Sequence, residues 1–242
     1  MDSHIKSDDQ VDWADFHNPE ESWRTRLLGD LSAQYAIPRY VQLFMDTFGE
    51  SDGLRLLEVG AGNGEVPLQI RDLDPACIGR YWVTELFREG TRWLDQQGLS
   101  ACAADAQRIP FADNSCDAAI SFDVLHHVSD PYLMAKEMVR VSRGRLLLVE
   151  SNGLSLGRKL MELTPGHRAA GERSYTPGQY RAFFAAACRL TRFEIKPFLF
   201  PFPGGVPPAP LRALIAFNRV IEKTPFFRWQ CSNVSIQIEF EQ

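Results

Sequence analysis

The fold of this sequence is decided by residues 54–64, Leu-Arg-Leu-Leu-Glu-Val-Gly-Ala-Gly-Asn-Gly. The apolar run that ends at Val59 predicts a short buried strand, and residues 64–73 predict a helix. Gly60 and Gly62 suit a tight turn, because glycine adopts positive φ at little cost and has no side chain to block a ligand. A strand that passes through such a turn into a helix leaves bare backbone at its carboxyl end, where open α/β sheets bind ligands.

Strands and helices alternate after this stretch. Strands are predicted over residues 80–84, 99–103, 117–122, 145–150 and 191–200, and helices over 87–97, 130–141, 176–184 and 211–223. The alternation indicates βαβ units and a largely parallel sheet with helices on both faces. Residues 234–240 alternate polar and apolar side chains, which predicts a final antiparallel strand at a sheet edge.

The chain is divided by these patterns into a tail with lid helices over 1–50, a main domain over 51–242 and, within it, a substrate cap over 200–230. In the N-terminal part, residues 18–21 have the side chains that begin a helix. Residues 31–48 predict one or two further helices, interrupted at Pro38. The cap is predicted because long inserts in compact domains often serve as lids or binding loops.

The composition is that of a globular protein, with 45% hydrophobic and 24% charged residues. No apolar run approaches the roughly 18 residues that a membrane span needs. The acidic N-terminus lacks the features of a secretory signal, so a cytoplasmic location is predicted. The five cysteines form no CxxC pair, which argues against structural zinc and against a disulfide framework.

Charge is distributed unevenly along the chain. Residues 1–150 contain 14 basic and 25 acidic residues, a net charge of −11, whereas residues 151–242 contain 12 basic and 6 acidic residues, a net charge of +6. Two interpretations stay open: chance together with a solvated acidic tail, or a basic C-terminal part that faces an anionic substrate or surface. A nucleic-acid partner is not predicted, because the overall charge is −5 and the basic residues are dispersed.

The glycine loop discriminates between ligands by its spacing and its charge. The third glycine of a dinucleotide-binding GxGxxG motif would fall at Glu65, and no basic residue follows the loop before Arg71, so a phosphate-binding loop is not indicated. Glu58 and Glu65 flank the loop and would repel a diphosphate. A ligand with a sulfonium and an ammonium group would be attracted, which favours S-adenosylmethionine over NAD, FAD or a nucleoside triphosphate.

Two more acidic residues follow predicted strands. Glu85 ends the second strand, 25 residues after Gly60, where a carboxylate can accept hydrogen bonds from both ribose hydroxyls. Asp105 follows the third strand, where a carboxylate can accept from the adenine amino group. Each alone is an ordinary loop acid. Together with the glycine loop, at successive strand ends, they favour a cofactor that contains adenosine.

The segment over residues 54–150 resembles the class I S-adenosylmethionine-dependent methyltransferases, especially the broad group that includes the quinone-biosynthesis methyltransferases. The resemblance is carried by LLEVGAGNG, VTE, AADAQRIPFADNSCDAAISFDVLHHVSDP and KEMVRVSRGRLLLVE. It implies a Rossmann-like seven-stranded sheet in the order 3-2-1-4-5-7-6, with strand 7 antiparallel. Cys116 departs from the family pattern, which usually has an aromatic residue at that position.

The resemblance also implies which residues line the cofactor. These are Glu58, Gly60, Ala61 and Gly62 at the methionine end, Glu85 at the ribose hydroxyls, Leu86, Asp105 and Ala106 at the adenine, and Ser121 and Phe122 on the sulfonium side.

A general base is needed if the methyl acceptor is a hydroxyl, a phenol or an acidic carbon, and it typically contributes about 10²–10⁴-fold to the rate. His126 and His127 follow the fourth strand and are the candidates, with His126 preferred and Asp123 weaker. The alternative is that this segment is a structural helix entrance. No spacing of Asp, Glu and Asn predicts a magnesium site.

The acceptor is expected to bind outside the shared core. The segment between the last two strands is rich in aromatic residues: Phe200, Phe202, Phe217, Phe226, Phe227 and Trp229. This composition favours a small hydrophobic or aromatic acceptor, which could be lipid-like or have an anionic group. We expect methylation on oxygen or carbon rather than on nitrogen. These aromatics could instead form a satellite core, and the helix over 211–223 could touch a lipid surface.

Three other functions stay open at this point: a non-methyl reaction on the same fold, methylation of a protein, and a cofactor-binding partner subunit without activity. The sequence leaves the oligomeric state open.

Overall fold

The computed structural model describes residues 35–73, 75–164, 173–199 and 208–241. A single mixed sheet runs through this part of the chain, in the strand order β3-β2-β1-β4-β5-β7-β6. Its strands are β1 (Leu54–Val59), β2 (Ile78–Glu85), β3 (Ser100–Ala103), β4 (Ala118–Phe122), β5 (Arg145–Ser151), β6 (Arg189–Phe198) and β7 (Asn233–Glu241). The first five are parallel, and β7 is antiparallel to both of its neighbours. The predicted seven-stranded order is confirmed.

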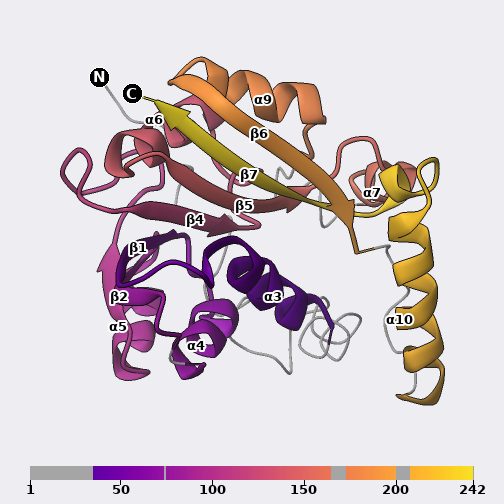
Figure 1. The fold of residues 1–242 in the computed structure, drawn as a ribbon, viewed down its shortest axis with the longest axis horizontal. Coiled ribbons are helices and arrows are strands. Elements are labelled where there is room, and N and C mark those ends of the chain that lie inside the picture. Colours follow the sequence, from indigo (N-terminus) through magenta and orange to yellow (C-terminus); the bar gives the residue numbers. More distant parts are fainter. Residues whose placement is uncertain (1–34, 74, 165–172, 200–207, 242) are drawn as a thin grey trace.

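The prediction that the final strand lies at a sheet edge was wrong. β7 pairs with β5 on one side and with β6 on the other, so β6 is the edge strand (Figure 1). The alternation of residues 234–240 reflects two differently covered faces. Val234, Ile236 and Ile238 are buried against the face that carries helix α9 (Pro177–Ala185), and Glu239 is exposed near the strand's end.

Helices cover both faces of the sheet (Figure 1). Besides α9, the described helices are α3 (Ile37–Phe48), α4 (Glu65–Asp72), α5 (Arg88–Gln96), α6 (Pro131–Val141), α7 (Leu156–Met161), α10 (Pro208–Lys223) and the 3₁₀ helix η2 (Arg228–Gln230). Helices α6 and α9 bury Met134, Met138 and Phe184 against one face. On the other face, α3 buries Phe44 and Phe48. The predicted helices on both faces are confirmed.

Side-chain caps explain where two of these helices begin. The Asp130 carboxylate accepts a hydrogen bond from the Tyr132 amide at 2.9 Å, with a proline at the first position of α6. Thr176 and Gln179 form a capping box at the start of α9. Pro38 lies in the first turn of α3, where its missing N–H costs nothing, and residues 35 and 36 directly before this helix are π-helical.

Helix α7 is an element that the sequence did not predict. It has only six residues, so its apolar side chains show no clear period. The insert between β6 and β7 is confirmed, and α10 and η2 lie in it. The predicted helix start at residues 18–21 and the aromatic side chains of Phe200 and Phe202 lie outside the described residues. Within the described ranges, the structure contains no helix with the length and apolar character of a membrane span.

Candidate cofactor and acceptor site

The glycine loop follows β1 at the carboxyl edge of the sheet, as predicted. Gly60 and Gly62 have φ values of +75° and +54°. A Cβ atom on Gly60 would lie 2.5 Å from the Val124 side chain, whereas one on Gly62 would have no atom within 4 Å. The Ala61 amide donates to the Thr84 carbonyl at 2.7 Å and joins the loop to β2. Glycine is therefore required at position 60 by packing and at position 62 by backbone conformation.

Glu85 ties the glycine loop to the end of β2. Its carboxylate accepts hydrogen bonds from the Gly62 amide at 2.9 Å and the Phe87 amide at 3.2 Å. Burial raises the pKa of Glu85, and these amide donors oppose the rise. The next residue, Leu86, is half-exposed at 54%, unlike the apolar residues that build the core. A carboxylate next to an exposed apolar side chain suits a ribose and its attached base.

Asp105 and Ala106 form the turn after β3. The Asp105 carboxylate accepts a hydrogen bond from the Gln107 amide at 2.8 Å and so shapes its own turn. The Gln107 side-chain oxygen accepts from the Ser129 hydroxyl and the Asp130 amide, both at 2.9 Å. Gln107 thereby links the loop after β3 to the start of α6. Sequence reasoning missed this link, because residues 22 positions apart gave no signal of contact.

Glu58 does not act as the charged flank that the sequence argument assumed. Its side chain is buried and accepts a hydrogen bond from the Tyr81 hydroxyl. Burial raises the pKa of Glu58 to about 8, so the group is mostly neutral at pH 7. The repulsion of diphosphates predicted for Glu58 is therefore absent at neutral pH. Glu65 is exposed beside the loop, as the argument requires.

Ser121 and Phe122, which end β4, point to opposite sides of the sheet. The Ser121 hydroxyl is buried and has no hydrogen-bond partner in the part of the chain that the structure describes. Phe122 stacks on Tyr40 of α3, with ring centroids 5.5 Å apart. Phe122 thus belongs to the packing between α3 and the sheet, whereas Ser121 is the unsatisfied polar group.

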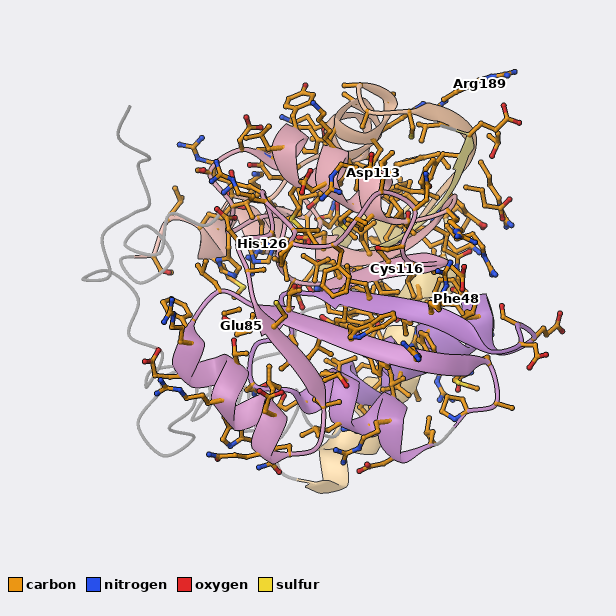
Figure 2. The ribbon with its side chains drawn as sticks, turned by 90° about the vertical axis from the view of Figure 1, so that its left-hand side faces the viewer. Phe48, Glu85, Asp113, Cys116, His126 and Arg189 are labelled. Atoms are coloured by element: carbon orange, nitrogen blue, oxygen red, sulfur yellow. The ribbon has the colours of Figure 1, made fainter. Side chains whose placement is uncertain are left out.

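His126 lies directly beyond β4 and is held by a carboxylate from β5. Its Nδ1 atom is 2.8 Å from Oε2 of Glu150, and both side chains are buried. The other Glu150 oxygen accepts from the amides of Val124 and Leu125 at 3.1 and 2.7 Å. Burial raises the pKa of Glu150 to about 7. Figure 2 shows His126 and Glu85 on the same side of the molecule.

His127 differs from His126 in exposure. Its side chain is exposed, although the two imidazole rings are only 4.1 Å apart. The structure therefore separates the two predicted bases into a buried, carboxylate-held histidine and a surface histidine. Sequence reasoning missed Glu150 as a site residue. The signal that could have identified it is an acidic residue at the carboxyl end of the most apolar predicted strand.

Asp123 joins three distant elements. Its carboxylate accepts from the Tyr40 hydroxyl of α3 at 2.6 Å and from the Asn233 amide of β7 at 3.2 Å. Its φ is +57°, a left-handed conformation that is uncommon outside glycine. Burial raises the pKa of Asp123, and the nearby Glu150 carboxylate adds to the rise. The contacts made by Tyr40 and Asn233 were not predictable, because they span 83 and 110 residues.

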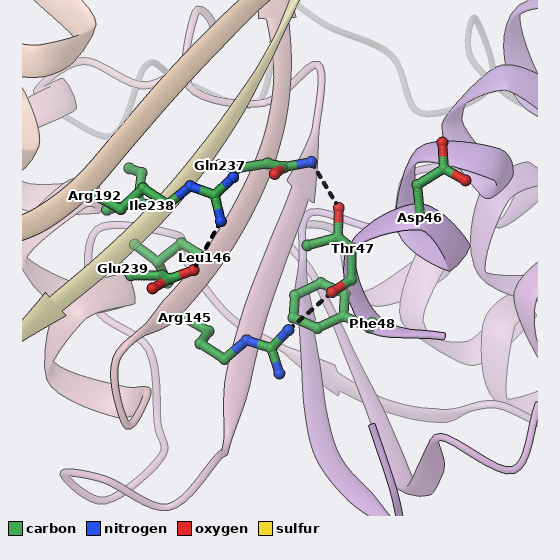
Figure 3. A pocket seen from close by; sticks show the side chains of 9 residues that line it. All are labelled: Asp46, Thr47, Phe48, Arg145, Leu146, Arg192, Gln237, Ile238 and Glu239. Atoms are coloured by element: carbon green, nitrogen blue, oxygen red, sulfur yellow. Dashed lines mark hydrogen bonds and ion pairs between the residues drawn. The ribbon is translucent and has the colours of Figure 1, made fainter. Parts of the chain in front are cut away.

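A separate hollow lies away from these residues. This pocket of about 170 Å³ is lined by residues at the end of α3 and at the start of β5, and Figure 3 shows its lining side chains. There the Gln237 amide donates to the Thr47 hydroxyl at 2.9 Å, and Arg145 donates to the Thr47 carbonyl at 2.8 Å. Arg145 begins β5, so this pocket is at the opposite end of the sheet from Glu150 and is a structural joint. In the described ranges, no group of His, Cys, Asp and Glu could hold a metal ion.

Comparison with known proteins agrees with this geometry. A family model described as a methyltransferase domain matches residues 57–148. A demethylmenaquinone methyltransferase of Beutenbergia cavernae is 37% identical over 109 residues, which cover 44% of this chain and 44% of the relative. An uncharacterised methyltransferase of Mycobacterium tuberculosis is 31% identical over 142 residues, which cover 58% and 53%. The chain spans about half the length of the curated relatives it matches.

Among solved structures, one similar protein is a Thermotoga maritima methyltransferase described as a possible histamine N-methyltransferase. It matches with a TM-score of 0.65 and 17% identity, over 95% of this chain and 99% of that one. At this identity the likeness shows the fold alone. Over residues 57–148 the chain is thus similar to a methyltransferase domain, and the sheet order and the glycine loop agree with the resemblance to the class I S-adenosylmethionine-dependent methyltransferases.

Proposed function

We propose that the protein transfers the methyl group of S-adenosylmethionine to an oxygen or carbon atom of a small apolar acceptor. The buried pair of His126 and Glu150 carries this proposal. A hydroxyl or acidic-carbon acceptor needs a proton acceptor at this edge of the sheet, whereas an amine that arrives neutral does not. The demethylmenaquinone methyltransferase among the relatives supports a small-molecule acceptor.

The residues at the carboxyl edge fit this cofactor. S-adenosylmethionine, when bound, supplies an electrophilic methyl group on a sulfonium centre. The loop over 60–62 offers close backbone approach, and Glu85 can accept from the ribose hydroxyls. Leu86, Asp105 and Ala106 would hold the adenine. The unsatisfied Ser121 hydroxyl can bond a polar group at the methionine end. We assign Glu58, bonded to Tyr81, and Phe122, stacked on Tyr40, to the same end as buried residues behind it.

In this proposal the Glu150 carboxylate fixes the orientation of His126. With Nδ1 as the donor to Oε2, the imidazole accepts a proton through Nε2. The two backbone amides on the other Glu150 oxygen hold the carboxylate in place. The bound donor would supply the methyl group with its neutral sulfur compound, S-adenosylhomocysteine, as the leaving group. His126 would take the proton that the acceptor loses, and the buried setting would keep water away.

We assign the acceptor side to residues around this pair. Helix α3 forms the described part of a lid over 1–50, because Tyr40 reaches from it to Asp123 beside His126. The methyltransferase domain follows over 51–242. Its insert over 200–230 is assigned as the cap above the acceptor, since α10 stands at the end of the sheet where β5 ends and β7 begins (Figure 1). The exposure of Phe226 and Phe227 argues against a satellite core for these two side chains.

Two measurements test the proposal. Calorimetry should show binding of S-adenosylmethionine and none of NAD, and a Glu85→Gln variant should bind more weakly. Candidate phenols, quinols and amines would then be incubated with a donor carrying an isotopic label in its methyl group. Labelled oxygen- or carbon-methyl products support the proposal. Labelled amines only, a product that contains no donor carbon, or binding without any product would overturn it.

A further inference from the structure

Exposed apolar side chains are concentrated in one region of the molecule. Twelve large apolar residues are exposed in the described part of the chain, and eight of them lie within residues 154–163 and 217–227: Leu154, Leu156, Leu160, Leu163, Phe217, Val220, Phe226 and Phe227. The most exposed of all is Phe226, at 82%. Single exposed apolar residues are ordinary, but such a concentration marks an interaction surface.

The two segments meet at η2, because the start of α7 is hydrogen-bonded to Gln230, the last residue of η2. The Ser155 hydroxyl donates to the Gln230 carbonyl at 2.9 Å, and the Leu156 amide donates to the Gln230 side chain at 3.1 Å. Helix α7 therefore lies against η2, next to the end of α10 (Figure 1). We call residues 154–163 and 217–228 the apolar–basic surface.

Cations border the apolar side chains on this surface. Arg219, Lys223 and Arg228 are exposed, and none of the three forms an ion pair with another described residue. On α10, Arg219 and Lys223 lie beside Val220, while Asn218 is buried on the inner face. Glu222 also faces inward, where it pairs with Arg39 at 2.9 Å. The charge of Glu222 is thus compensated by Arg39, whereas Arg219 and Lys223 of the same helix stay exposed.

We infer that the apolar–basic surface docks on an anionic lipid bilayer. Aromatic and leucine side chains can enter the boundary between headgroups and acyl chains, while the adjacent cations meet the negative headgroups. A symmetric contact between two copies of the chain would bring the same cations together, which disfavours that occupant. The inference stands apart from the proposed function, because it needs no catalytic residue.

The surface lies at the end of the sheet that holds the candidate acceptor site. Helix α7 follows the end of β5, which carries Glu150, and η2 precedes β7, which carries Asn233. Docking through this end would orient the acceptor side toward the membrane. A bilayer-dissolved acceptor could then reach the site without crossing water.

Vesicle sedimentation of the full chain tests the inference. Vesicles of phosphatidylcholine and phosphatidylglycerol in equal parts should carry the protein into the pellet, and added salt should weaken binding. Pure phosphatidylcholine should carry less. The double variant Phe226→Ser/Phe227→Ser should bind at least about tenfold more weakly, because two exposed aromatics no longer enter the bilayer. Arg219→Glu/Lys223→Glu should lose about tenfold or more through charge reversal.

Leu73→Ser is the matched control, since Leu73 is also exposed but lies at the end of α4. It should bind vesicles like the unchanged protein, and calorimetry with S-adenosylmethionine should be the same for every variant. The inference is overturned if the unchanged chain stays in the supernatant, or if the Phe226/Phe227 variant binds equally well. A concentration-dependent dimer abolished by that variant, without vesicle binding, would assign the surface to a second copy instead.

Discussion

The proposed cofactor side and the proposed acceptor side of the site, both at the carboxyl ends of the strands, are built in different ways. On the cofactor side, backbone amides of the glycine loop meet a carboxylate at the end of the adjacent strand, as Gly62 meets Glu85. On the acceptor side, side chains from α3, β5 and β7 converge on Asp123 and His126. The first arrangement depends on short loops between neighbouring strands. The second depends on contacts between segments far apart in the chain, so each side should respond to its own set of substitutions.

The largest effect is expected for His126→Ala. Loss of the general base should lower the turnover number by about 10²–10⁴-fold. Affinity for S-adenosylmethionine, measured by calorimetry, should stay unchanged because the cofactor side is intact. His127→Ala is the matched control, since this neighbour is exposed and lacks the Glu150 contact. A His126 variant with normal turnover, or a His127 variant with the larger loss, would contradict the assignment.

Gly60→Ala should damage the cofactor side. The new methyl group would lie 2.5 Å from Val124 on a backbone with φ of +75°. Strain and overpacking together should cost about 2–4 kcal/mol of unfolding free energy, measured with urea, and should abolish detectable cofactor binding. Gly53→Ala is the control, because φ there is also positive but no atom lies within 4 Å of the new Cβ. Equal losses in both variants would show that strain alone, without the Val124 contact, explains the effect.

Glu58→Gln tests the neutral state of the buried acid in β1. The pKa of Glu58 is raised by burial from 4.5 to about 8, so the folded chain holds a proton that the unfolded chain releases. This contribution to stability is complete below pH 4.5 and is lost as pH rises toward 8. The glutamine variant has no carboxyl group to titrate, so its unfolding free energy should lack the part of the decrease with pH that Glu58 causes. At pH 8 it should be more stable by on the order of 1–4 kcal/mol.

Thermal unfolding across pH 4.5–8.5 measures this difference. Glu65→Gln, an exposed change on the same loop, is its control and should keep the profile of the unchanged chain. If the stability profile of Glu58→Gln also matches that of the unchanged chain, the carboxyl group of Glu58 is ionised in the folded protein. Glu58 would then repel diphosphates together with Glu65, as the sequence predicted.

Tyr40→Phe should give the smallest effect and should mark the acceptor side. It removes the hydroxyl that donates to Asp123 at 2.6 Å but keeps the ring that stacks on Phe122. We expect a loss of about 1–2 kcal/mol in unfolding free energy. The KM for the acceptor should rise while cofactor affinity is kept. A change in cofactor affinity of similar size would show that the two sides are coupled through α3.

The sequence predicts the strand, the glycine loop and the helix of the proposed cofactor side well, because these signals are local. A buried strand, two glycines and a helix start lie within residues 54–65, and Glu85 follows a strand that pairs directly with β1. On the proposed acceptor side, the sequence pointed only to Asp123, His126 and His127, which follow β4 in the chain. Glu150 of β5 is the partner of His126 and Asn233 of β7 is a partner of Asp123, and no sequence pattern indicated that these side chains would meet.

The burial of individual side chains is a second property that the sequence did not predict. The acidic pattern around the loop suggested two charges, but only the structure shows that Glu58 is enclosed beside Tyr81. The position of β7 was misjudged from its alternation. The alternating pattern reports how the two faces of a strand are covered, and it does not report whether both of its backbone edges are paired.

The central place of β7 has a consequence for the order of assembly. In the described chain, β6 pairs with no strand but β7, and β5 is joined to β6 only through it. During synthesis, β1 to β5 can pair as soon as they emerge from the ribosome. Strand β6 must wait, with its hydrogen-bonding edge open, until residue 241 has been translated. The last third of the chain is therefore the stretch in which a nascent molecule is most in need of protection from aggregation.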